Sequence, residues 1–424
     1  MFEKSLLIFL IIIFVLLGYS KYTLLKNYQR KLFYTFLIII FIWSLFSLIK
    51  VIYNNYTYPK EWDYLTFFID GHIAKNGLNF YQTESYKIVI NNLDIPLIPS
   101  KLFNEAVINV GFNYPPPTMF IFLPLGFFNF NTSHMLWLII NIFFLFADIF
   151  LLWKIFFDKD NLIGLLLSSV LFLILPATWN TIYYEQTSFI LLFFILLLWK
   201  DKKNARSGIW LAIGIFIKPF VALLFLFFLL NRLRKQLYIL ILNTIVICLL
   251  TIIIFSPEIF FSYFTKNPNS NVPNWQFIEN INQSLLSTIL RLTHYEFGNL
   301  SPLTNPIFII VSCIILTITI VLTYRFGLEK IDWAFNLFLL CAILLYPGTL
   351  SHYSVFLIIP IIYLFKYTIS SKKGILFSII FASIIYFLLK SDFVFIANCI
   401  TFIAFIGLYI WNPKTTVKPN LSYA

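Results

Sequence analysis

Long apolar runs alternate with short polar gaps from one end of the chain to the other. A helix needs about 20 apolar residues to cross a bilayer, and fewer where it is short or broken. The first run is interpreted as a retained span, because its flank is not clearly basic and no cleavage site of small residues follows it. The pattern predicts membrane-spanning helices at residues 5–20, 32–52, 133–155, 162–176, 187–199, 208–217, 220–230, 237–256, 304–324, 332–346, 353–365, 374–389 and 393–411.

The gaps between the runs differ in charge, and this difference predicts how the chain is oriented. Cytoplasmic loops of membrane proteins carry an excess of lysine and arginine, and such residues gather in alternate gaps, at 21–31, 200–206, 232–235, 325–330 and 366–373. The other loops, at 53–132, 177–186, 257–303 and 347–352, are then expected on the non-cytoplasmic side. We predict one all-α domain over residues 1–424, a polytopic transmembrane helix bundle of about 11–13 spans with a large first outer loop at 53–132.

Residues 208–230 are long enough for one span, but one span would place a strongly basic gap outside. Proline lacks an N–H and disrupts a helix, so a break at Lys218 and Pro219 predicts two half-helices that form a hairpin with Lys218 at its tip. A lysine within an apolar run costs several kcal/mol unless it has a partner or water. An anionic phosphate is the partner we expect; the alternative is a lysine that extends to the membrane interface.

Composition excludes a soluble protein. Hydrophobic residues make up 60% of the chain and charged residues 11%, with a mean hydropathy of +0.87, whereas soluble domains are about one quarter charged. The net charge of +12 lies in the gaps and not in a basic stripe, so no nucleic-acid partner is expected. Many Phe, Ile, Lys and Asn residues are typical of an AT-rich bacterial genome, which favours a bacterial plasma membrane.

The first outer loop holds two carboxylates among aromatic residues, Asp63 and Asp70, just beyond a predicted span. A carboxylate in such a place can act as a general base; alternatively both are ordinary loop acids near the headgroups. The loop continues to Tyr114 and three prolines, which precede an apolar stretch too short to span and interrupted by Pro124. This predicts an interfacial or re-entrant helix, or a stiff turn.

Further polar residues fall at the outward ends of predicted spans. Amides, a guanidinium and an imidazole suit sugar hydroxyls and phosphate oxygens, although each of these residues alone is equally typical of a cap or a loop. What they share is the side of the membrane to which the basic gaps assign them. They are Glu185 and Gln186; Asn280, Asn282, Gln283 and Ser284 with Arg291; and Ser351, His352 and Tyr353.

Several patterns point away from metal and redox chemistry. Asp158, Lys159 and Asp160 form a DxD triplet, but it lies in a short gap on the predicted cytoplasmic side, and we interpret it as a solvated turn. Cys248, Cys313, Cys341 and Cys399 fall inside apolar runs without CxxC spacing, so we expect buried thiols. We predict no cofactor and no catalytic metal.

In these motifs the sequence resembles glycosyltransferase family 87, bacterial enzymes similar to polyprenyl-phosphate-mannose-dependent α-mannosyltransferases. The resemblance spans residues 63–360. Two departures concern Glu185, where the family usually has glycine, and Phe67, where tyrosine is common. The matching residues, in order, are Asp63, Phe67, Gly77 and Tyr81; Tyr114, Pro115, Pro116, Pro124 and Leu125; Gln186; Lys218 and Pro219; Asn282, Gln283, Ser284 and Arg291; and Ser351, His352 and Tyr353.

The resemblance implies a C-superfamily glycosyltransferase fold and an inverting, metal-independent transfer of a hexose, with mannose expected, from a polyprenyl-phosphate donor to a lipid or glycan acceptor. It implies that Asp63 is the base, and we expect Lys218, Arg291 and His352 to hold the departing polyprenyl phosphate. The other residues expected to contact substrate are Tyr353, Gln186, Asn282, Gln283, Ser284, Tyr114 and Asp70.

Two alternatives from other classes stay open. A transporter or a lipid or glycan flippase also has many spans and intramembrane charge, but it should show inverted repeats and polar residues at mid-membrane depth in both halves. A polysaccharide polymerase or ligase should carry arginine pairs in a large outer loop, whereas the predicted outer loops contain Arg291 alone.

Overall fold

The computed structural model describes residues 11, 15, 17–18, 26–57, 62–93, 111–157, 162–265, 277, 282–293, 302–326, 330–368, 372–391 and 393–411. Within these ranges the chain is helical, and the only β-type pairing is an isolated bridge between Asn282 and Leu350. The predicted all-α class is confirmed. The α-helices are α2 (Asn27–Thr57), α3 (Trp62–Lys75), α4 (Thr83–Asn92), α6 (Met119–Phe122), α7 (Phe130–Phe156), α8 (Leu162–Ile174), α9 (Pro176–Tyr183), α10 (Ser188–Lys200), α11 (Ser207–Ile217), α12 (Leu224–Leu230), α13 (Arg234–Phe255), α14 (Pro257–Thr265), α16 (Leu285–Leu292), α17 (Pro306–Phe326), α18 (Ile331–Leu345), α19 (Ile358–Thr368), α20 (Lys372–Lys390) and α21 (Val394–Trp411).

Five helices in the described part of the chain are long and apolar enough to cross a membrane, namely α2, α7, α13, α17 and α20. A sixth span results if α8 and α9, which meet at a bend of 65°, count as one broken span. Most of α13 and α17 is not covered by protein, and side chains such as Ile253 and Ile310 are exposed. Apolar faces of this kind are stable only against lipid, so the protein is a multi-pass membrane protein.

The predicted span 5–20 lies largely outside the described residues, and the remaining predicted spans fall on shorter helices, α10, α11, α12, α18, α19 and α21. The count of about 11–13 spans therefore stays a prediction, because hydropathy marks an apolar run but not the length of the helix it forms. The prediction of buried thiols is confirmed for Cys341, whereas Cys248 and Cys399 are half-buried. It is wrong for Cys313, which is exposed on α17 because that helix is largely uncovered by protein.

The chain reverses direction at Lys218. Gly208, at the start of α11, lies so close to the carbonyl oxygen of Gln236 in α13 that a β-carbon there would be 2.3 Å from it. The helix α12 ends only a few residues before α13 begins, so α11 starts and α12 finishes at the same end of the bundle. Between them Lys218 has extended backbone angles, φ −148° and ψ 119°. The two short helices form the predicted hairpin, with Lys218 at its tip.

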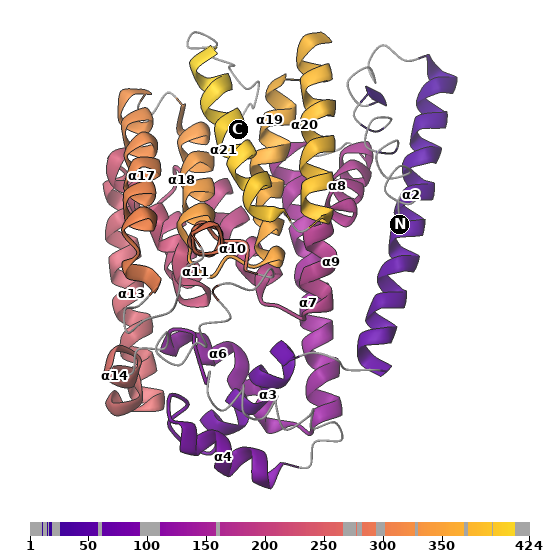
Figure 1. Ribbon diagram of the computed structural model, residues 1–424. Helices are drawn as coiled ribbons and strands as arrows, with labels where there is room; N and C mark the ends of the chain where they lie inside the picture. Colours follow the sequence, from indigo (N-terminus) through magenta and orange to yellow (C-terminus); the bar gives the residue numbers. More distant parts are fainter. Residues whose placement is uncertain are drawn as a thin grey trace.

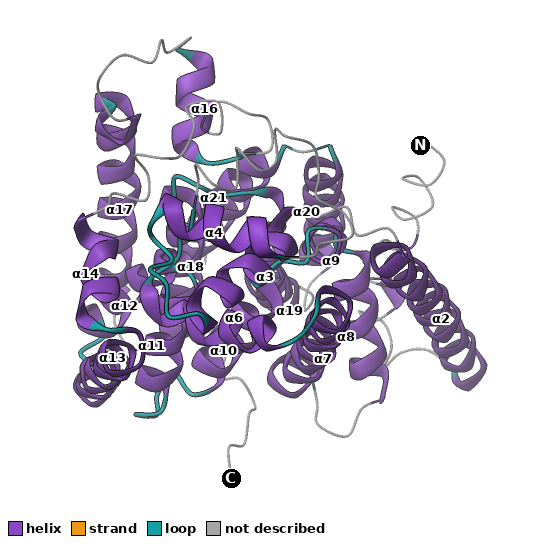
Figure 2. Cartoon of the chain, turned by 90° about the horizontal axis from the view of Figure 1, so that it is seen from below, coloured by secondary structure: helices purple, strands orange, loops and turns teal. Residues whose placement is uncertain are grey.

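A second layer of short helices closes one end of the bundle (Figure 1). It consists of α3, α4 and α6, with the 3₁₀ helices η2 (Pro116–Thr118) and η3 (Leu123–Phe127), and it crosses the centre of this face when seen from below (Figure 2). Gly71 of α3 and Gly126 of η3 touch through their backbones, since a β-carbon on Gly126 would lie 2.2 Å from the Gly71 oxygen. The Thr118 hydroxyl donates to the Phe216 carbonyl in α11, which fixes the layer beside the hairpin tip.

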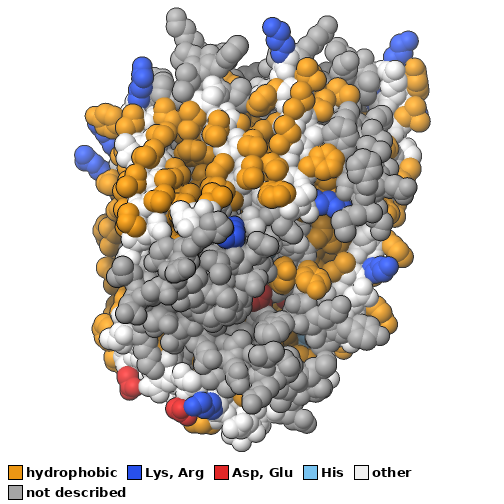
Figure 3. All heavy atoms as spheres, in the orientation of Figure 1, with side chains coloured by type: hydrophobic (Ala, Val, Ile, Leu, Met, Phe, Trp, Pro, Cys, Tyr) orange, Lys and Arg blue, Asp and Glu red, His pale blue; other side chains and the backbone are white. Residues whose placement is uncertain are grey.

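Charge separates the two ends of the molecule. Several Lys and Arg side chains line the upper edge in Figure 3, above a broad band of apolar side chains. In Figure 1 this edge contains the starts of α2 and α13. Because Gly208 at the start of α11 contacts Gln236 of α13, the exposed Lys203 and Arg206 just before α11 lie at the same end. The second layer lies at the opposite end, so the polar outer loop and the basic gaps are on different sides of the apolar band.

Candidate functional site

Four polar side chains from distant parts of the chain meet where the hairpin tip faces the second layer. The Lys218 ammonium donates to Gln186 Oε1 at 3.3 Å and to the Tyr353 hydroxyl at 2.8 Å. The Asp63 carboxyl lies beside the Gln186 side chain and interacts electrostatically with Lys218. A carboxylate, an amide, an ammonium and a phenol therefore form one cluster.

Local structure explains how each segment places its side chain in this cluster. Asp63 lies in the first turn of α3, where the unsatisfied N–H groups and the helix dipole favour a negative charge. Lys218 precedes Pro219, which cannot continue the hydrogen bonding of α11. Gln186 follows α9, and its N–H bonds to the Thr181 carbonyl at 3.1 Å. Tyr353 lies in the 3₁₀ helix η8 (Ser351–Leu357).

Lys218 is almost fully buried, with 2% of its surface exposed. A buried ammonium is stable only with hydrogen bonds and compensating charge. Gln186 and Tyr353 accept from two of its three donors, and its Nζ lies 4.0 Å from the ring centre of Tyr353 and 5.9 Å from that of Tyr114. The arrangement leaves one N–H for a ligand oxygen.

Asp63 is only partly exposed, and burial raises the pKa of its carboxyl above the ordinary value. The neighbouring Gln186 side chain and the charge of Lys218 act in the opposite direction and lower this pKa. A carboxyl whose pKa is raised above its ordinary value is suited to accept a proton from a hydroxyl.

His352 lies beside the cluster, with its ring centre 4.6 Å from that of Tyr353. It is buried, and its Nε2 has no hydrogen-bond partner among the described residues. A buried polar atom without a partner costs free energy, and a ligand oxygen would remove that cost. Its backbone oxygen lies 3.5 Å from the Thr181 hydroxyl, at the limit of a hydrogen bond.

The Asn282, Gln283 and Ser284 segment supports the loop that leads to His352. Asn282 pairs with Leu350 in the isolated bridge, and the Gln283 N–H donates to the Thr349 carbonyl at 2.7 Å. Ser284 caps α16 by accepting from Ser287. The structure thus places this motif against the loop before η8, and a contact of these side chains with substrate stays a prediction. Asn280 lies outside the described residues.

Arg291 donates to the Asn282 carbonyl at 2.9 Å and to the Ser287 hydroxyl at 2.8 Å. These contacts hold α16 to the same supporting segment. The structure connects Arg291 to the cluster through the loop before His352, and its direct binding to phosphate stays a prediction.

Asp70 belongs to different surroundings, although it is on the same helix as Asp63. It is 1% exposed, the Tyr86 hydroxyl of α4 donates to it, and burial raises its pKa to about 8. Near neutral pH this carboxyl is largely protonated. Its position between α3 and α4 favours a structural role over contact with substrate.

Tyr114 connects the second layer to the cluster. Its carbonyl accepts from the Tyr81 hydroxyl at 2.7 Å, and its ring packs edge-on against Phe67, with centres 6.0 Å apart.

Gly77 ends α3 with a φ of 67°, a left-handed conformation that glycine adopts without strain. The residues Asp63, Phe67, Gly77 and Tyr81 thus build α3 and the turn that follows it.

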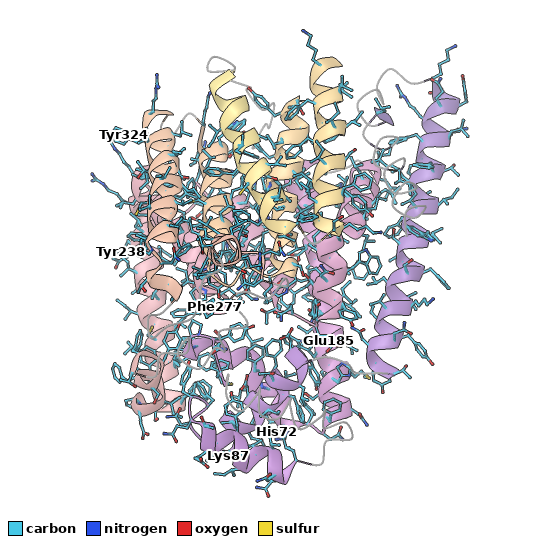
Figure 4. All side chains as sticks on the ribbon, in the orientation of Figure 1. His72, Lys87, Glu185, Tyr238, Phe277 and Tyr324 are labelled. Carbon is cyan, nitrogen blue, oxygen red and sulfur yellow. The ribbon has the colours of Figure 1, made fainter. Side chains whose placement is uncertain are left out.

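His134 is a residue near the cluster that no sequence motif indicated. Its Nε2 lies 2.8 and 3.0 Å from the two carboxylate oxygens of Glu185, and each of these residues is 2% exposed. Figure 4 shows Glu185 at the level where the bundle meets the second layer. A histidine in the first turns of an otherwise apolar helix was the available signal, together with a glutamate where the family usually has glycine.

In the described part of the chain, no group of three or more His, Cys, Asp and Glu side chains could hold a metal ion. The triplet Asp158, Lys159 and Asp160 lies outside the described residues.

Comparison with known proteins adds one assignment. The model of glycosyltransferase family 87 matches residues 112–351, more than half of the 424 residues. The match contains Tyr114, Gln186, Lys218 and the segment from Asn282 to Arg291, while Asp63, His352 and Tyr353 lie outside it. No curated protein and no solved structure matches the chain.

Proposed function

The chain belongs to glycosyltransferase family 87, and from this premise we propose that it transfers a hexose from a polyprenyl-phosphate donor to a lipid or glycan acceptor. The sugar we expect is mannose, and the reaction takes place on the non-cytoplasmic side with inversion at the anomeric carbon. The family assignment supports sugar transfer by a membrane protein; the donor, the stereochemistry and the side are our inference.

One observation carries the proposal, namely that the Gln186 amide joins a carboxylate and a buried ammonium. Gln186 accepts from Lys218, and its side chain lies beside Asp63. Transfer from a sugar phosphate needs these two groups, because a proton must leave the attacking hydroxyl while negative charge grows on the departing phosphate. The Gln186 amide thus lies next to both the proposed base and the cation.

In the proposed reaction the acceptor oxygen forms a bond to the anomeric carbon as the bond from that carbon to the phosphate oxygen breaks. The hydroxyl proton passes to Asp63, and the electron pair of the broken bond stays on the polyprenyl phosphate. The phosphate charge grows from −1 to −2, and Lys218 and His352 stabilise it. A fixed cation where charge develops can provide this stabilisation, so we expect no requirement for a metal ion.

The position of the cluster supports a lipid-linked donor. The cluster lies at the hairpin tip beside the second layer, so a polyprenyl chain can stay in lipid while its phosphate reaches Lys218. On the non-cytoplasmic side nucleotide sugars are not normally present, so a donor carried by lipid fits the expected orientation.

The test is to incubate the purified protein with labelled polyprenyl-phosphate mannose or another polyprenyl-phosphate hexose and an extract of cell lipids. We expect a labelled product that forms equally well with a chelator present, and an anomeric configuration opposite to that of the donor. Asp63→Asn should lower transfer by a factor of about 100 or more, as expected for loss of a general base. Asp70→Asn should reduce it far less.

Equal losses at the two positions would contradict the choice of Asp63 as the base. Absence of transfer with every polyprenyl-phosphate donor would contradict the function itself. It would favour the transporter or flippase alternative, which fluorescent lipids in proteoliposomes would then test.

A further inference from the structure

Two helices in this protein end in the same hydrogen-bond pattern but with different residues. At the end of α3 the N–H of Gly77 bonds to the Ala74 carbonyl and that of Leu78 to the Ile73 carbonyl. At the end of α9 the N–H of Glu185 bonds to the Ile182 carbonyl, and Gln186 completes the pattern. Both are Schellman motifs, whose penultimate position is left-handed and usually glycine.

Glu185 therefore occupies a position that disfavours it in two ways. Its φ is 51°, a conformation in which the β-carbon of an L-residue approaches the carbonyl oxygen. Its charged side chain is 2% exposed, and burial of a carboxylate needs compensation. A buried residue with a strained backbone conformation is retained only where neighbouring groups fix that conformation.

The helix α7 supplies these surroundings. His134 contacts both carboxylate oxygens of Glu185, and the indole N–H of Trp137, one turn later, donates to the Glu185 backbone carbonyl at 2.7 Å. The ring centre of His134 also lies 4.5 Å from that of Tyr64, the residue next to Asp63. One turn of α7 thus contacts both segments that carry the carboxylate and its amide partner.

We propose that His134 and Glu185 form a buried hydrogen-bonded pair that positions Gln186 between Asp63 and Lys218. Glu185 is bonded to Gln186 through the backbone, so fixing residue 185 fixes the direction in which the Gln186 amide leaves the chain. These are positioning residues, because they act on the reacting atoms through Gln186. The inference rests on the proposed function, since it assigns the cluster to sugar transfer.

Glu185→Gly is the informative substitution. Glycine relieves the left-handed backbone and removes the buried carboxylate, so a purely structural role predicts an unchanged or more stable protein with normal turnover. We expect kcat to fall by about tenfold or more, because displacement of a reacting group by about 1 Å can cost a factor of about 100. The donor KM should change much less, since Tyr353 still holds Lys218.

Loss of the carboxylate leaves His134 without its partner, so a second variant guards against misfolding. Glu185→Gly combined with His134→Leu leaves neither polar group buried alone, and it should show the same fall in kcat as either single change. Residues that act as one unit give such non-additive losses. Glu185→Gln keeps an acceptor for the imidazole N–H in the same place and should restore most of the turnover.

Asn141→Leu is the matched control. Asn141 lies two turns further along α7, is also buried, and donates to the Trp137 carbonyl, so its replacement tests general damage to this helix and should leave kcat within about twofold. Wild-type turnover in Glu185→Gly, or in the double variant, would overturn the inference. If the wild-type protein transfers no sugar, the proposed function fails instead, so the two failures are distinguishable.

Discussion

Lys218 shows what a buried charge requires in this protein. Two acceptor oxygens, two neighbouring aromatic rings and the nearby Asp63 carboxyl replace the water that an exposed ammonium would have. Removing one partner from such a group leaves the other uncompensated and costs several kcal/mol. Each member of the cluster thus affects the others, and variants need a readout that separates substrate binding from folding.

Replacing Lys218 by methionine tests its contact with the donor. The expected loss is roughly 2 to 4 kcal/mol in donor use, the order found when one partner of a buried charge pair is truncated. Lys218→Arg keeps the charge but changes the geometry, so partial activity is expected. Initial rates against donor concentration give the measurement, and near-normal kinetics in Lys218→Met would exclude phosphate binding by this residue.

Asp70 should make stability depend on pH. The pKa of its carboxyl is about 8 in the folded protein, against an ordinary value of 3.8, so between these values the folded state holds a proton that the unfolded state has released. The free energy of unfolding therefore falls as pH rises through this range. Relative to Asp70→Asn, the wild-type Tm in detergent should decrease from pH 5 to pH 8; parallel curves for the two proteins would contradict the assignment.

At the scale of the elements, the apolar pattern predicted most of the helices. Each predicted run that the structure describes lies on a helix, because lipid-facing and buried helices are both apolar and the pattern is local in sequence. The break at Pro219 and the opposing basic gaps also predicted the hairpin. Helix lengths, the 65° bend between α8 and α9 and the packing of α3 on η3 depend on contacts between distant residues, which periodicity does not contain.

The candidate site was predictable only in part, for the same reason. Asp63, Gln186 and Tyr353 came from short motifs whose order resembled a family, and the structure brings them together at Lys218. No local sequence feature distinguishes Asp63 from Asp70. In the fold Asp70 is buried and accepts from Tyr86, whereas Asp63 lies beside Gln186 and Lys218. His134 stands alone in an apolar run, and only the fold pairs it with Glu185.

For the whole molecule, the two ends differ in charge, and this predicts its orientation. Lys203 is expected in the cytoplasm and the α3–α4 turn outside. The side chain of Tyr81 in that turn is buried, so the exposed Glu84 is the better outside probe. Cysteines introduced at 84 and 203 in a cysteine-free variant should react with an impermeant reagent from opposite sides; outside labelling at 203 would contradict both the topology and the side proposed for the reaction.

The depth of the hairpin tip at Lys218 makes donor binding depend on the membrane potential. Its first helix has 11 residues, about 17 Å at 1.5 Å each, so Lys218 lies roughly halfway through a hydrocarbon core of about 30 Å. Because the cytoplasm is negative, a donor phosphate that moves from outside to Lys218 crosses about half of the membrane potential against the field. The electrical work is about 1 kcal/mol per charge at 100 mV. The product phosphate carries twice the charge and is expelled more strongly. In proteoliposomes with an imposed potassium gradient, the donor KM should rise as the interior becomes more negative. A donor KM that does not change with the membrane potential would contradict this depth of Lys218 in the membrane.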